Sequence, residues 1–357
     1  MGAGAIGLWL GGRLAAAGLP VEFVGRPRVL DPIARDGLAL SDMDGFDARV
    51  PAAALSLHDH VPRADEAPAP ALVLLCVKSG ATAAAAAELA AALPAGTPVI
   101  SMQNGLHNAQ VARDAAPSLH VLSGMVPYNI ALLSPTAAHR GSGGVLAVQD
   151  DEVTRAWAPV FASAGLPWQR HADFRAVQWA KLLLNLNNPV NALSGLPLKA
   201  QLLDADLRRS TAMLMSEALS LLKAAGLPLA KLTPLPPRTV PWVLRLPTPL
   251  FRAVASRMLA IDDRARSSMA DDLAQGRATE VRQLCGEVVR LAMAQGLAAP
   301  LNAKMIELVE QAPAREHPWP GAALRLALRA AAAPRASSTR SFARRKGPRQ
   351  PPSAGTH

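Results

Sequence analysis

Met1-Gly2-Ala3-Gly4-Ala5-Ile6-Gly7 is the stretch that decides the fold of this chain, and the sequence opens with it. It is a Gly-x-Gly-x-x-Gly motif. The first glycine allows a tight turn, the second lets a phosphate approach backbone N–H groups, and the third lets a helix pack closely on a strand. An apolar stretch that predicts a helix over 6–17 follows at once, and then a strand over 21–24. We therefore predict that a dinucleotide pyrophosphate binds at the turn formed by Gly2, Ala3, Gly4, Ala5, Ile6 and Gly7.

The strand that normally precedes such a turn is not represented in the sequence. Met1 stands where that strand would end. A parallel sheet without its central first strand loses pairing on both sides, so we expect the true chain to begin several residues upstream of Met1.

After the turn, short β-rich runs alternate with helical stretches up to about residue 170. Strands are predicted over 21–24, 71–77, 97–102 and 119–125, and a further helix over 81–93. The runs are continuously apolar, which is typical of a parallel sheet covered by helices on both faces. A glycine-rich segment over 141–148 suggests one added antiparallel strand or hairpin.

From Asp173 the pattern changes to long helical periods. Asp173 is a predicted N-cap for a helix that Pro189 interrupts, and further helices are expected near 199–226, 262–275, 278–295 and 299–311, with an irregular proline-rich connection over 233–250. The predicted fold is therefore an α/β N-terminal Rossmann-type doubly wound domain (1–172) followed by an all-α C-terminal domain (173–332).

The net charge of +10 is unevenly distributed. Six of the excess positive charges lie in residues 333–357, which contain no acid; they are Arg335, Arg340, Arg344, Arg345, Lys346 and Arg349. This Ser-, Pro- and Arg-rich tail cannot bury enough apolar surface to fold, so we expect it to be disordered. It is either a solvated tail without function or a weak polyanion-binding arm. We expect no nucleic acid partner for the folded part.

The sequence predicts a cytoplasmic protein with no membrane partner. No run approaches the roughly 18 apolar residues needed to cross a bilayer, and no signal segment opens the chain. The two cysteines, Cys76 and Cys285, have no CxxC partner, so we expect buried structural thiols and no metal site. Composition does not distinguish a monomer from a homodimer.

Arg26 indicates which dinucleotide is bound. An NAD-specific site places an acid at the end of the second strand, about 20 residues after the glycine motif, to bind the ribose hydroxyl. Here that position holds Arg26, whose guanidinium suits a 2′-phosphate. This predicts NADP(H), although Arg26 and Arg28 could also be two solvated loop residues.

Polar residues follow two of the predicted strands, at the sheet edge where ligands bind. Lys78 follows the strand over 71–77, and Asn104 follows the strand over 97–102. Each alone is more often a surface residue, but together they predict contacts to the cofactor or to a substrate oxygen.

The segment 179–193 carries the strongest chemical indication. Lys181 and Asn185 lie four residues apart on one face of a strongly apolar helix, and Asn188 follows just before Pro189. A lysine and amides in such surroundings need polar partners, which a substrate carboxylate and keto oxygen would provide. The alternative is a lysine that reaches solvent, with asparagines that cap the helix. A second polar segment, 266–280, contains Ser268 and Glu280.

Together these segments resemble the ketopantoate reductase family: GAGAIG at 2–7, Arg26, VKS at 77–79, QNG at 103–105, KLLLN at 181–185, and SSM and GRATE within 267–280. The resemblance covers residues 1 to about 330. It implies NADPH-dependent reduction of 2-dehydropantoate (ketopantoate), with Lys181 as general acid and Glu280 as a catalytic residue that binds the substrate hydroxyl. It also implies that Asn104, Asn185, Asn188 and Ser268 hold the substrate, and that Lys78 and Asn104 lie beside the cofactor.

The chain departs from the family pattern at one site residue. The family places an asparagine four residues after the one matching Asn185, whereas Asn188 comes after only three. A paralogue that reduces another 2-keto acid is therefore one alternative. A non-catalytic NADP(H)-binding regulator is another, although such a protein need not retain a lysine at the position of a general acid.

Overall fold

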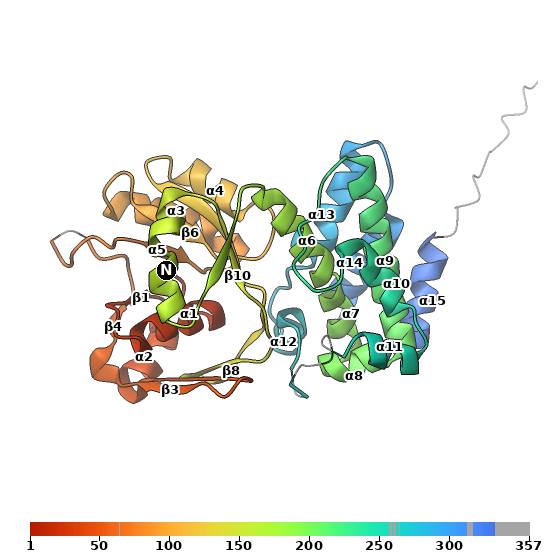
Figure 1. Cartoon of the computed structure of the whole chain (residues 1–357), viewed down its shortest axis with the longest axis horizontal. Helices are drawn as coiled ribbons and strands as arrows, with labels where there is room; N and C mark the ends of the chain where they lie inside the picture. The colour runs from red at the N-terminus through yellow and green to blue at the C-terminus, as the bar shows by residue number, and fades with distance from the viewer. Residues whose placement is uncertain (64, 257–258, 260–261, 264, 313–316, 333–357) are drawn as a thin grey trace, which may run out of the picture.

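The computed structural model describes residues 1–63, 65–256, 259, 262–263, 265–312 and 317–332. Figure 1 shows two lobes, an α/β lobe formed by the first half of the chain and a helical lobe formed by the second. Each lobe has its own apolar core. The predicted order of an α/β domain and then an all-α domain is confirmed. The predicted tail, 333–357, lies outside the described residues.

The largest sheet of the α/β lobe has five strands in the order β11-β10-β7-β6-β5. Their bounds are β5 Val73–Leu75, β6 Pro98–Ser101, β7 His120–Met125, β10 Leu146–Gln149 and β11 Trp168–His171. The first three are parallel, as predicted. β10 pairs antiparallel with β7, which confirms the added strand and makes the sheet mixed.

Met1 occupies a gap beside this sheet. β1 (Glu22–Val24) pairs in parallel with β4 (Ser56–His58) in a separate two-stranded ladder. Between β1 and β5, the Met1 carbonyl accepts a hydrogen bond from the Cys76 N–H at 2.8 Å, and the Gly2 N–H donates to the Val24 carbonyl at 2.8 Å. Met1 and Gly2 thus bridge the two ladders.

Five α-helices and two short 3-10 helices accompany these strands. They are α1 Ala5–Ala16, α2 Pro27–Asp36, η1 Ala52–Ala54, η2 Ser79–Ala81, α3 Thr82–Ala92, α4 Asn108–Ala115 and α5 Glu152–Ser163. Helix α1 is apolar around most of its surface, and it is largely buried as such helices must be. Gly11 lets Phe23 of β1 approach, since a Cβ there would lie 2.6 Å from the Phe23 ring.

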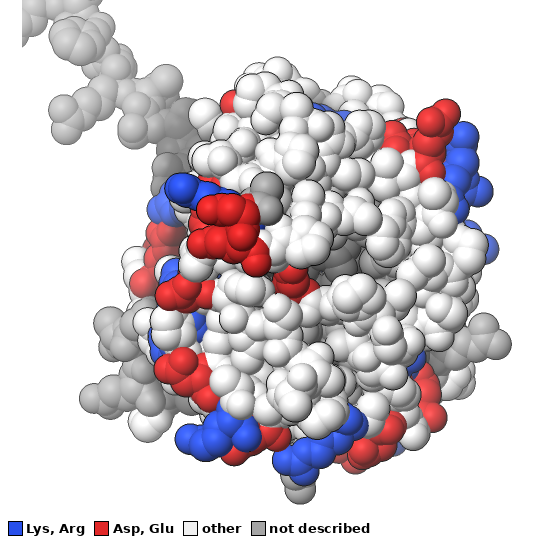
Figure 2. All heavy atoms as spheres, turned by 90° about the vertical axis from the view of Figure 1, so that its left-hand side faces the viewer, with Lys and Arg blue, Asp and Glu red and all other residues white. Residues whose placement is uncertain are grey.

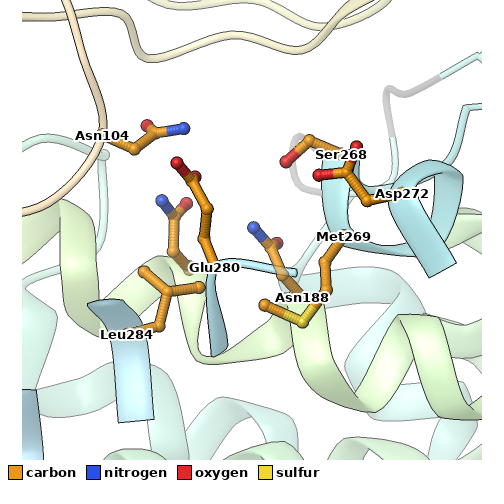
Figure 3. Close-up of a pocket in the computed structure, with 8 residues that line it drawn as sticks. Asn104, Asn188, Ser268, Met269, Asp272, Glu280 and Leu284 are labelled. Atoms are coloured by element: carbon orange, nitrogen blue, oxygen red, sulfur yellow. The ribbon is translucent and has the colours of Figure 1, made fainter. Parts of the chain in front are cut away.

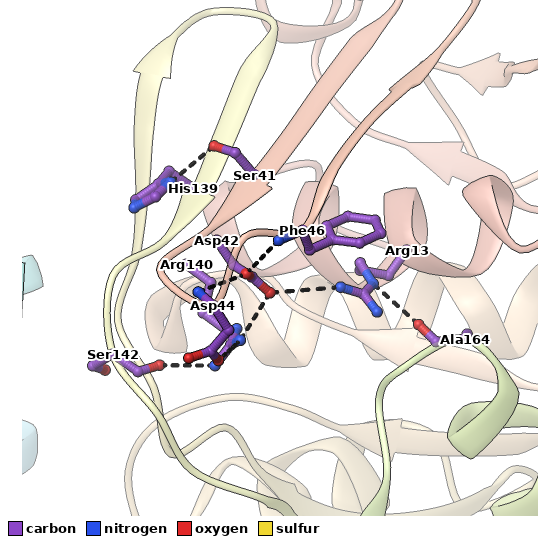
Figure 4. Close-up of polar contacts among 9 residues, drawn as sticks. All are labelled: Arg13, Ser41, Asp42, Asp44, Phe46, His139, Arg140, Ser142 and Ala164. Atoms are coloured by element: carbon purple, nitrogen blue, oxygen red, sulfur yellow. Dashed lines mark hydrogen bonds and ion pairs between the residues drawn. The ribbon is translucent and has the colours of Figure 1, made fainter.

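A second sheet, which the sequence did not predict, lies against α1. It has the order β3-β2-β9-β8, with β2 Leu38–Asp42, β3 Asp47–Val50, β8 Ile130–Ser134 and β9 Ala137–Arg140. Asp42 joins it to the helix: its carboxylate accepts a hydrogen bond from Arg140 at 2.8 Å and lies 3.7 Å from Arg13 of α1 (Figure 4). Arg13 also donates to the Ala164 carbonyl at 3.0 Å, so this pair of arginines fixes α1 against its surroundings.

The helical lobe contains ten α-helices and one 3-10 helix among the described residues. They are α6 Phe174–Asn185, α7 Asn187–Ser194, α8 Leu198–Leu203, α9 Ala205–Ala224, η3 Pro237–Thr239, α10 Val240–Leu244, α11 Thr248–Val254, α12 Ser268–Ala274, α13 Val281–Ala294, α14 Pro300–Gln311 and α15 Gly321–Ala332. Asp173 caps α6 as predicted, accepting a hydrogen bond from the Ala176 N–H at 3.1 Å.

Three predicted helix boundaries are wrong. The helix from Asp173 ends at Asn185, and Pro189 lies inside the next helix, α7, near its N-terminus where proline is tolerated. The single helix expected over 199–226 is broken at Asp204, whose carboxylate caps α9. The helix expected over 262–275 begins only at Ser268, because the Ser267 hydroxyl caps α12 there.

The charged surface of the α/β lobe is mixed in sign. Figure 2 views this lobe from the side away from the helical lobe: uncharged residues cover most of the face, acidic groups reach from one side toward its middle, and both signs of charge lie around its rim. Among the described helices, none is long and apolar enough to cross a membrane. Cys285 is buried as predicted, but Cys76 is only half-buried. No cluster of metal-ligating side chains occurs in the described part of the chain.

Candidate active site

The glycine turn has the geometry that an anion site requires. Gly2 has φ +98°, and a Cβ there would lie 2.6 Å from the Val77 backbone nitrogen. A Cβ at Gly7 would lie 2.0 Å from the Gly2 carbonyl oxygen, whereas Gly4 faces open space. No side chain caps the N-terminus of α1, and no acid lies in its first turn. The first N–H groups of this helix are therefore available to a negatively charged group.

Arg26 lies beside this turn. It follows β1, is exposed, and is the N-cap residue of α2. The preceding Gly25 approaches the turn closely, since a Cβ there would lie 2.6 Å from Ala3 Cβ. The structure thus brings the end of β1 next to the predicted pyrophosphate site.

Five of the predicted substrate-site residues line one hollow between the lobes. Asn104 comes from the α/β lobe, and Figure 3 shows the Glu280 side chain pointing toward it from the helical lobe. The complete lining of this hollow is Asn104, Asn185, Asn188, Ser268, Met269, Asp272, Glu280 and Leu284. Segments separated by up to 180 residues therefore meet at one polar site.

A second hollow adjoins the first and contains Lys181. The two share Asn104, Asn185 and Leu284. The other lining residues of the second hollow are Gln103, Gly105, Gly124, Met125, Gln178, Lys181 and Leu182.

Lys181 is partly buried on α6 and reaches the α/β lobe. Its ammonium donates a hydrogen bond to the Pro127 carbonyl at 3.0 Å. Burial lowers the pKa of Lys181 to about 8, because a charged ammonium loses hydration there. An amine with this pKa exchanges a proton readily near neutral pH, which general acid–base chemistry requires.

Glu280 stands just before α13 and links the two lobes. Its carboxylate accepts a hydrogen bond from the Ser79 hydroxyl at 3.1 Å. Burial raises the pKa of Glu280, and the bond from Ser79 and the charge of Lys78 partly oppose that rise. Lys181 and Glu280 thus face adjoining hollows and have different hydrogen-bond partners.

Lys78 joins the lobes through Asp272, a residue of the polar segment 266–280 to which the sequence gave no role. Its ammonium lies 2.8 Å from Asp272, which lines the first hollow and is only 8% exposed. Arg277 lies 2.8 Å from the same carboxylate oxygen. The spacing in the sequence could have indicated Asp272 as a site residue. It follows Ser268 by four residues, so both lie on one face of α12.

The side chains of Gln103 and Asn108 form hydrogen bonds that hold the turn that carries Asn104. Gln103 donates to the Val77 carbonyl at 2.8 Å and to the Thr82 hydroxyl at 2.7 Å. Asn108 donates to the Asn104 carbonyl and, at 3.0 Å, to the Ser79 hydroxyl. The sequence gave Gln103 and Asn108 no role, and the structure makes them supports for the ends of β5 and β6.

The shortened spacing at Asn188 does not remove this residue from the site. The chain turns at Leu186, between α6 and α7, and both Asn185 and Asn188 line the first hollow. Asn187 faces elsewhere and exchanges two hydrogen bonds with Gln201, at 3.1 and 2.8 Å.

These features define a class of protein. A Rossmann-type domain presents an open glycine turn, and residues 77–78 connect that turn to a polar hollow shared with a helical domain. Ligands of doubly wound domains bind at this edge of the sheet, and the arrangement is that of a two-domain, dinucleotide-binding oxidoreductase.

Comparison with known proteins identifies the family. Residues 1–151 match the family described as "Ketopantoate reductase PanE/ApbA", and residues 173–312 match its C-terminal counterpart. The chain belongs to the ketopantoate reductase family.

Individual relatives agree with this assignment. The chain is 27% identical over 318 residues to the 2-dehydropantoate 2-reductase of Halobacterium salinarum, covering 87% of this chain and 97% of the relative. It is 30% identical to the crystal structure of a PanE/ApbA family ketopantoate reductase from Ralstonia eutropha, with a TM-score of 0.72 over 88% of this chain and 97% of the other. A structure of D-mandelate dehydrogenase with NADH and anilino(oxo)acetate shares the fold, with a TM-score of 0.69 at 18% identity, covering 88% of this chain and 96% of the other.

Proposed function

We propose that this protein reduces 2-dehydropantoate to pantoate with NADPH, in the biosynthesis of pantothenate and coenzyme A. The observation that carries the proposal is Lys181, a lysine whose pKa is lowered to about 8. It faces a hollow lined by amides, and the adjoining hollow is lined by Ser268 and Glu280. The names of the curated relatives support the same substrate.

The glycine turn fits a nicotinamide dinucleotide. Gly4 faces open space, and the uncapped N-terminus of α1 offers its N–H groups to the pyrophosphate. Arg26 would bind the 2′-phosphate, which favours NADPH over NADH. Lys78 and Asn104 would lie on the cofactor side of the hollow. The bound cofactor supplies the hydride that is transferred to the substrate carbonyl.

Lys181 would act as the general acid. Its ammonium would bind the 2-keto oxygen, stabilise the negative charge that develops there, and donate a proton to it. In the free protein this ammonium donates to the Pro127 carbonyl, which holds it at the hollow before substrate binds. A lysine whose pKa is near 8 loses this proton more easily than an ordinary lysine.

Glu280 would bind the substrate hydroxyl and help position Lys181, and the amides would hold the rest of the substrate. Asn104, Asn185, Asn188 and Ser268 line one hollow from both lobes, so they can contact opposite sides of a small molecule. Met269 and Leu284 give this hollow an apolar wall, which suits a branched carbon chain.

A paralogous activity on another 2-keto acid is the second candidate. The likeness of the fold to D-mandelate dehydrogenase and the shortened Asn185–Pro189 spacing favour testing it. A non-catalytic regulator is less well supported, because binding alone gives no reason to keep a desolvated lysine.

The test is NADPH oxidation, followed by absorbance, with 2-dehydropantoate and a panel of other 2-keto acids. We expect the fastest turnover on 2-dehydropantoate. Faster turnover on another keto acid would support the proposed mechanism but assign a different substrate. Tight NADPH binding without any turnover would favour the regulator.

We propose a domain division at residues 172–173, where β11 gives way to α6, and a cytoplasmic monomer or homodimer. The basic residues of 333–357 would not contribute to catalysis, and a chain ending at 332 should retain its turnover.

A further inference from the structure

One loop of the α/β lobe is anchored in the helical lobe. It comprises residues 104–107, between β6 and α4, and it carries Asn104 to both hollows. The Leu106 side chain is 9% exposed and belongs to the apolar core of the helical lobe, whose other buried members all come from residues 179–328. Gln178 of α6 reaches the same loop, with its amide nitrogen 3.4 Å from the Leu106 carbonyl oxygen. The position of Asn104 therefore depends on the helical lobe as well as on the strand that precedes it.

A histidine and a buried glutamate make a further contact between this loop and the helical lobe. The His107 imidazole donates a hydrogen bond from Nε2 to the Glu287 carboxylate of α13, with 3.0 Å between nitrogen and oxygen. The Glu287 side chain is only 7% exposed, whereas that of His107 is half-exposed. Arg290 of α13 binds the same carboxylate. The proposed reaction gives neither His107 nor Glu287 a role.

The buried carboxylate of Glu287 costs free energy that an apolar side chain at this position would not. Arg290 lies on the same helix and is half-exposed, so its pairing with Glu287 does not require the carboxylate to face the α/β lobe. The contact with His107 does require it. Buried ionic groups can fix one geometry even where they add no stability. What Glu287 fixes is the end of the loop that carries Asn104.

The spacing along α13 connects this contact to the hollows. Glu280, Leu284 and Glu287 follow one another at intervals of four and three residues, so they lie along one stripe of the helix. The Glu280 carboxylate accepts a hydrogen bond from the Ser79 hydroxyl at 3.1 Å. Glu287 meets His107 about 10 Å further along the helix axis. Leu284, between these two contacts, lines both hollows, so α13 is joined to the α/β lobe on either side of the proposed substrate site.

The start of α4 transmits the position of His107 to Asn104. His107 is the N-cap residue of α4, and its carbonyl accepts a hydrogen bond from the Val111 N–H at 2.8 Å. The next residue, Asn108, donates to the Asn104 carbonyl through its side-chain amide. A shift of His107 therefore moves the group that holds the Asn104 backbone.

We propose that His107 and Glu287 are positioning residues, which together hold Asn104 in place for the substrate. Neither residue lines either hollow, so the pair acts through Asn104 and not by contact with the substrate. The proposal rests on the proposed function, because that function gives Asn104 a substrate to hold.

The first test compares turnover with cofactor binding. His107→Ala and Glu287→Leu should each lower kcat/KM for the keto acid about tenfold or more, since a misplacement of about 1 Å can cost about 100-fold. The Kd for NADPH should stay the same, because the proposed phosphate-binding groups belong to α1 and α2. Glu287→Gln keeps an oxygen that accepts from His107 and should restore most of the turnover. His120→Ala is the matched control and should leave kcat/KM unchanged, since it removes a similar pair, with Asp151 at 3.1 Å, within the α/β lobe.

Combined variants show whether the pair acts through Asn104. In an Asn104→Ala background, His107→Ala should cause little further loss of kcat/KM. The variant His107→Ala/Glu287→Leu should be no worse than either single variant, because residues that act as one unit are not additive. Losses that simply multiply would overturn the proposal, and so would an unchanged kcat/KM in His107→Ala. Circular dichroism establishes that each variant is folded.

Hydrogen exchange tests the pair without reference to catalysis. Amide exchange of the peptide that spans residues 103–111 should be about tenfold faster in His107→Ala than in the wild type or in His120→Ala, because the loop loses one of its anchors. Unchanged exchange would overturn the proposal. A wild type that reduces no keto acid would contradict the proposed function, and the exchange rates would then still decide whether His107 holds the loop.

Discussion

Replacement of Lys181 by methionine should abolish turnover and yet stabilise the protein. Methionine has a similar length and can fill the same space without a charge. The wild-type lysine has a pKa of about 8 in the folded protein, against 10.5 when it is fully hydrated. At neutral pH the folded state must therefore hold an ammonium that is poorly hydrated.

The size of the effect follows from that difference. Each pKa unit corresponds to about 1.4 kcal/mol, so the lowered pKa of Lys181 represents about 3 kcal/mol at pH 7. Methionine removes this cost but leaves the Pro127 carbonyl without its hydrogen bond, which subtracts about 1 kcal/mol. We expect Lys181→Met to raise the free energy of unfolding by about 2 kcal/mol at pH 7.

The gain should disappear at alkaline pH. Because the pKa of Lys181 is lower in the folded state, the unfolded chain binds more protons between about pH 8 and 10.5. The wild type therefore becomes relatively more stable as pH rises through this window, and the methionine variant does not. From pH 7 to pH 9.5 the difference between them should shrink by about 2 kcal/mol.

Urea unfolding, followed by tryptophan fluorescence at the two pH values, measures this difference. The control is Lys223→Met, at an exposed lysine of α9, which should give no pH-dependent change of this size. If Lys181→Met is no more stable than the wild type at pH 7, or if its advantage is the same at pH 9.5, Lys181 is not desolvated and the argument for its role fails.

Four other predictions concern the same chain. Lys181→Ala should lower kcat about 100-fold or more, the usual loss when a general acid is removed, whereas near-normal turnover would refute that role. The wild-type kcat/KM should fall as pH rises above about 8, since the ammonium form of Lys181 is then depleted; a flat profile to pH 9.5 would contradict this. Arg26→Ala should raise the KM for NADPH more than that for NADH, and equal rises would remove the argument for the 2′-phosphate. Arg208→Leu should lower the free energy of unfolding by about 2–4 kcal/mol, because the carbonyls of residues 244 and 246 lose their buried donor.

The sequence predicted the elements around the glycine turn well because local rules determine them. The motif at 2–7 requires a strand-turn-helix arrangement, and Asp173 caps a helix through its own side chain. The four-stranded sheet was missed because β2 pairs with β9 across 98 residues, and because β3 and β8 carry exposed side chains. Short strands of that kind have no apolar alternation to detect.

Helix boundaries failed where a cap or a turn lies inside a stretch of helical periodicity, as at Asp204 and Ser267, which cap α9 and α12. Pro189 looked like a helix stop, but the chain turns earlier, at Leu186, which places Pro189 in the first turn of α7, where proline is tolerated. The turn also directs Asn187 into hydrogen bonds with Gln201 and away from the hollow. No spacing rule distinguishes Asn187 from Asn188, because only the position of α8 decides which of them faces the site.

The candidate site shows the same division between local and distant causes. Lysine, amides and a glutamate could be selected from the sequence because apolar surroundings make such residues costly without partners. The low pKa of Lys181 could not be predicted from the sequence, because it depends on which residues of the α/β lobe cover the ammonium. Likewise, Lys78 and Asp272 lie 194 residues apart in the chain and 2.8 Å apart in space. Their pairing exists only because both lobes meet at this hollow, so it is the relative position of the lobes, more than either lobe alone, that forms the proposed catalytic site.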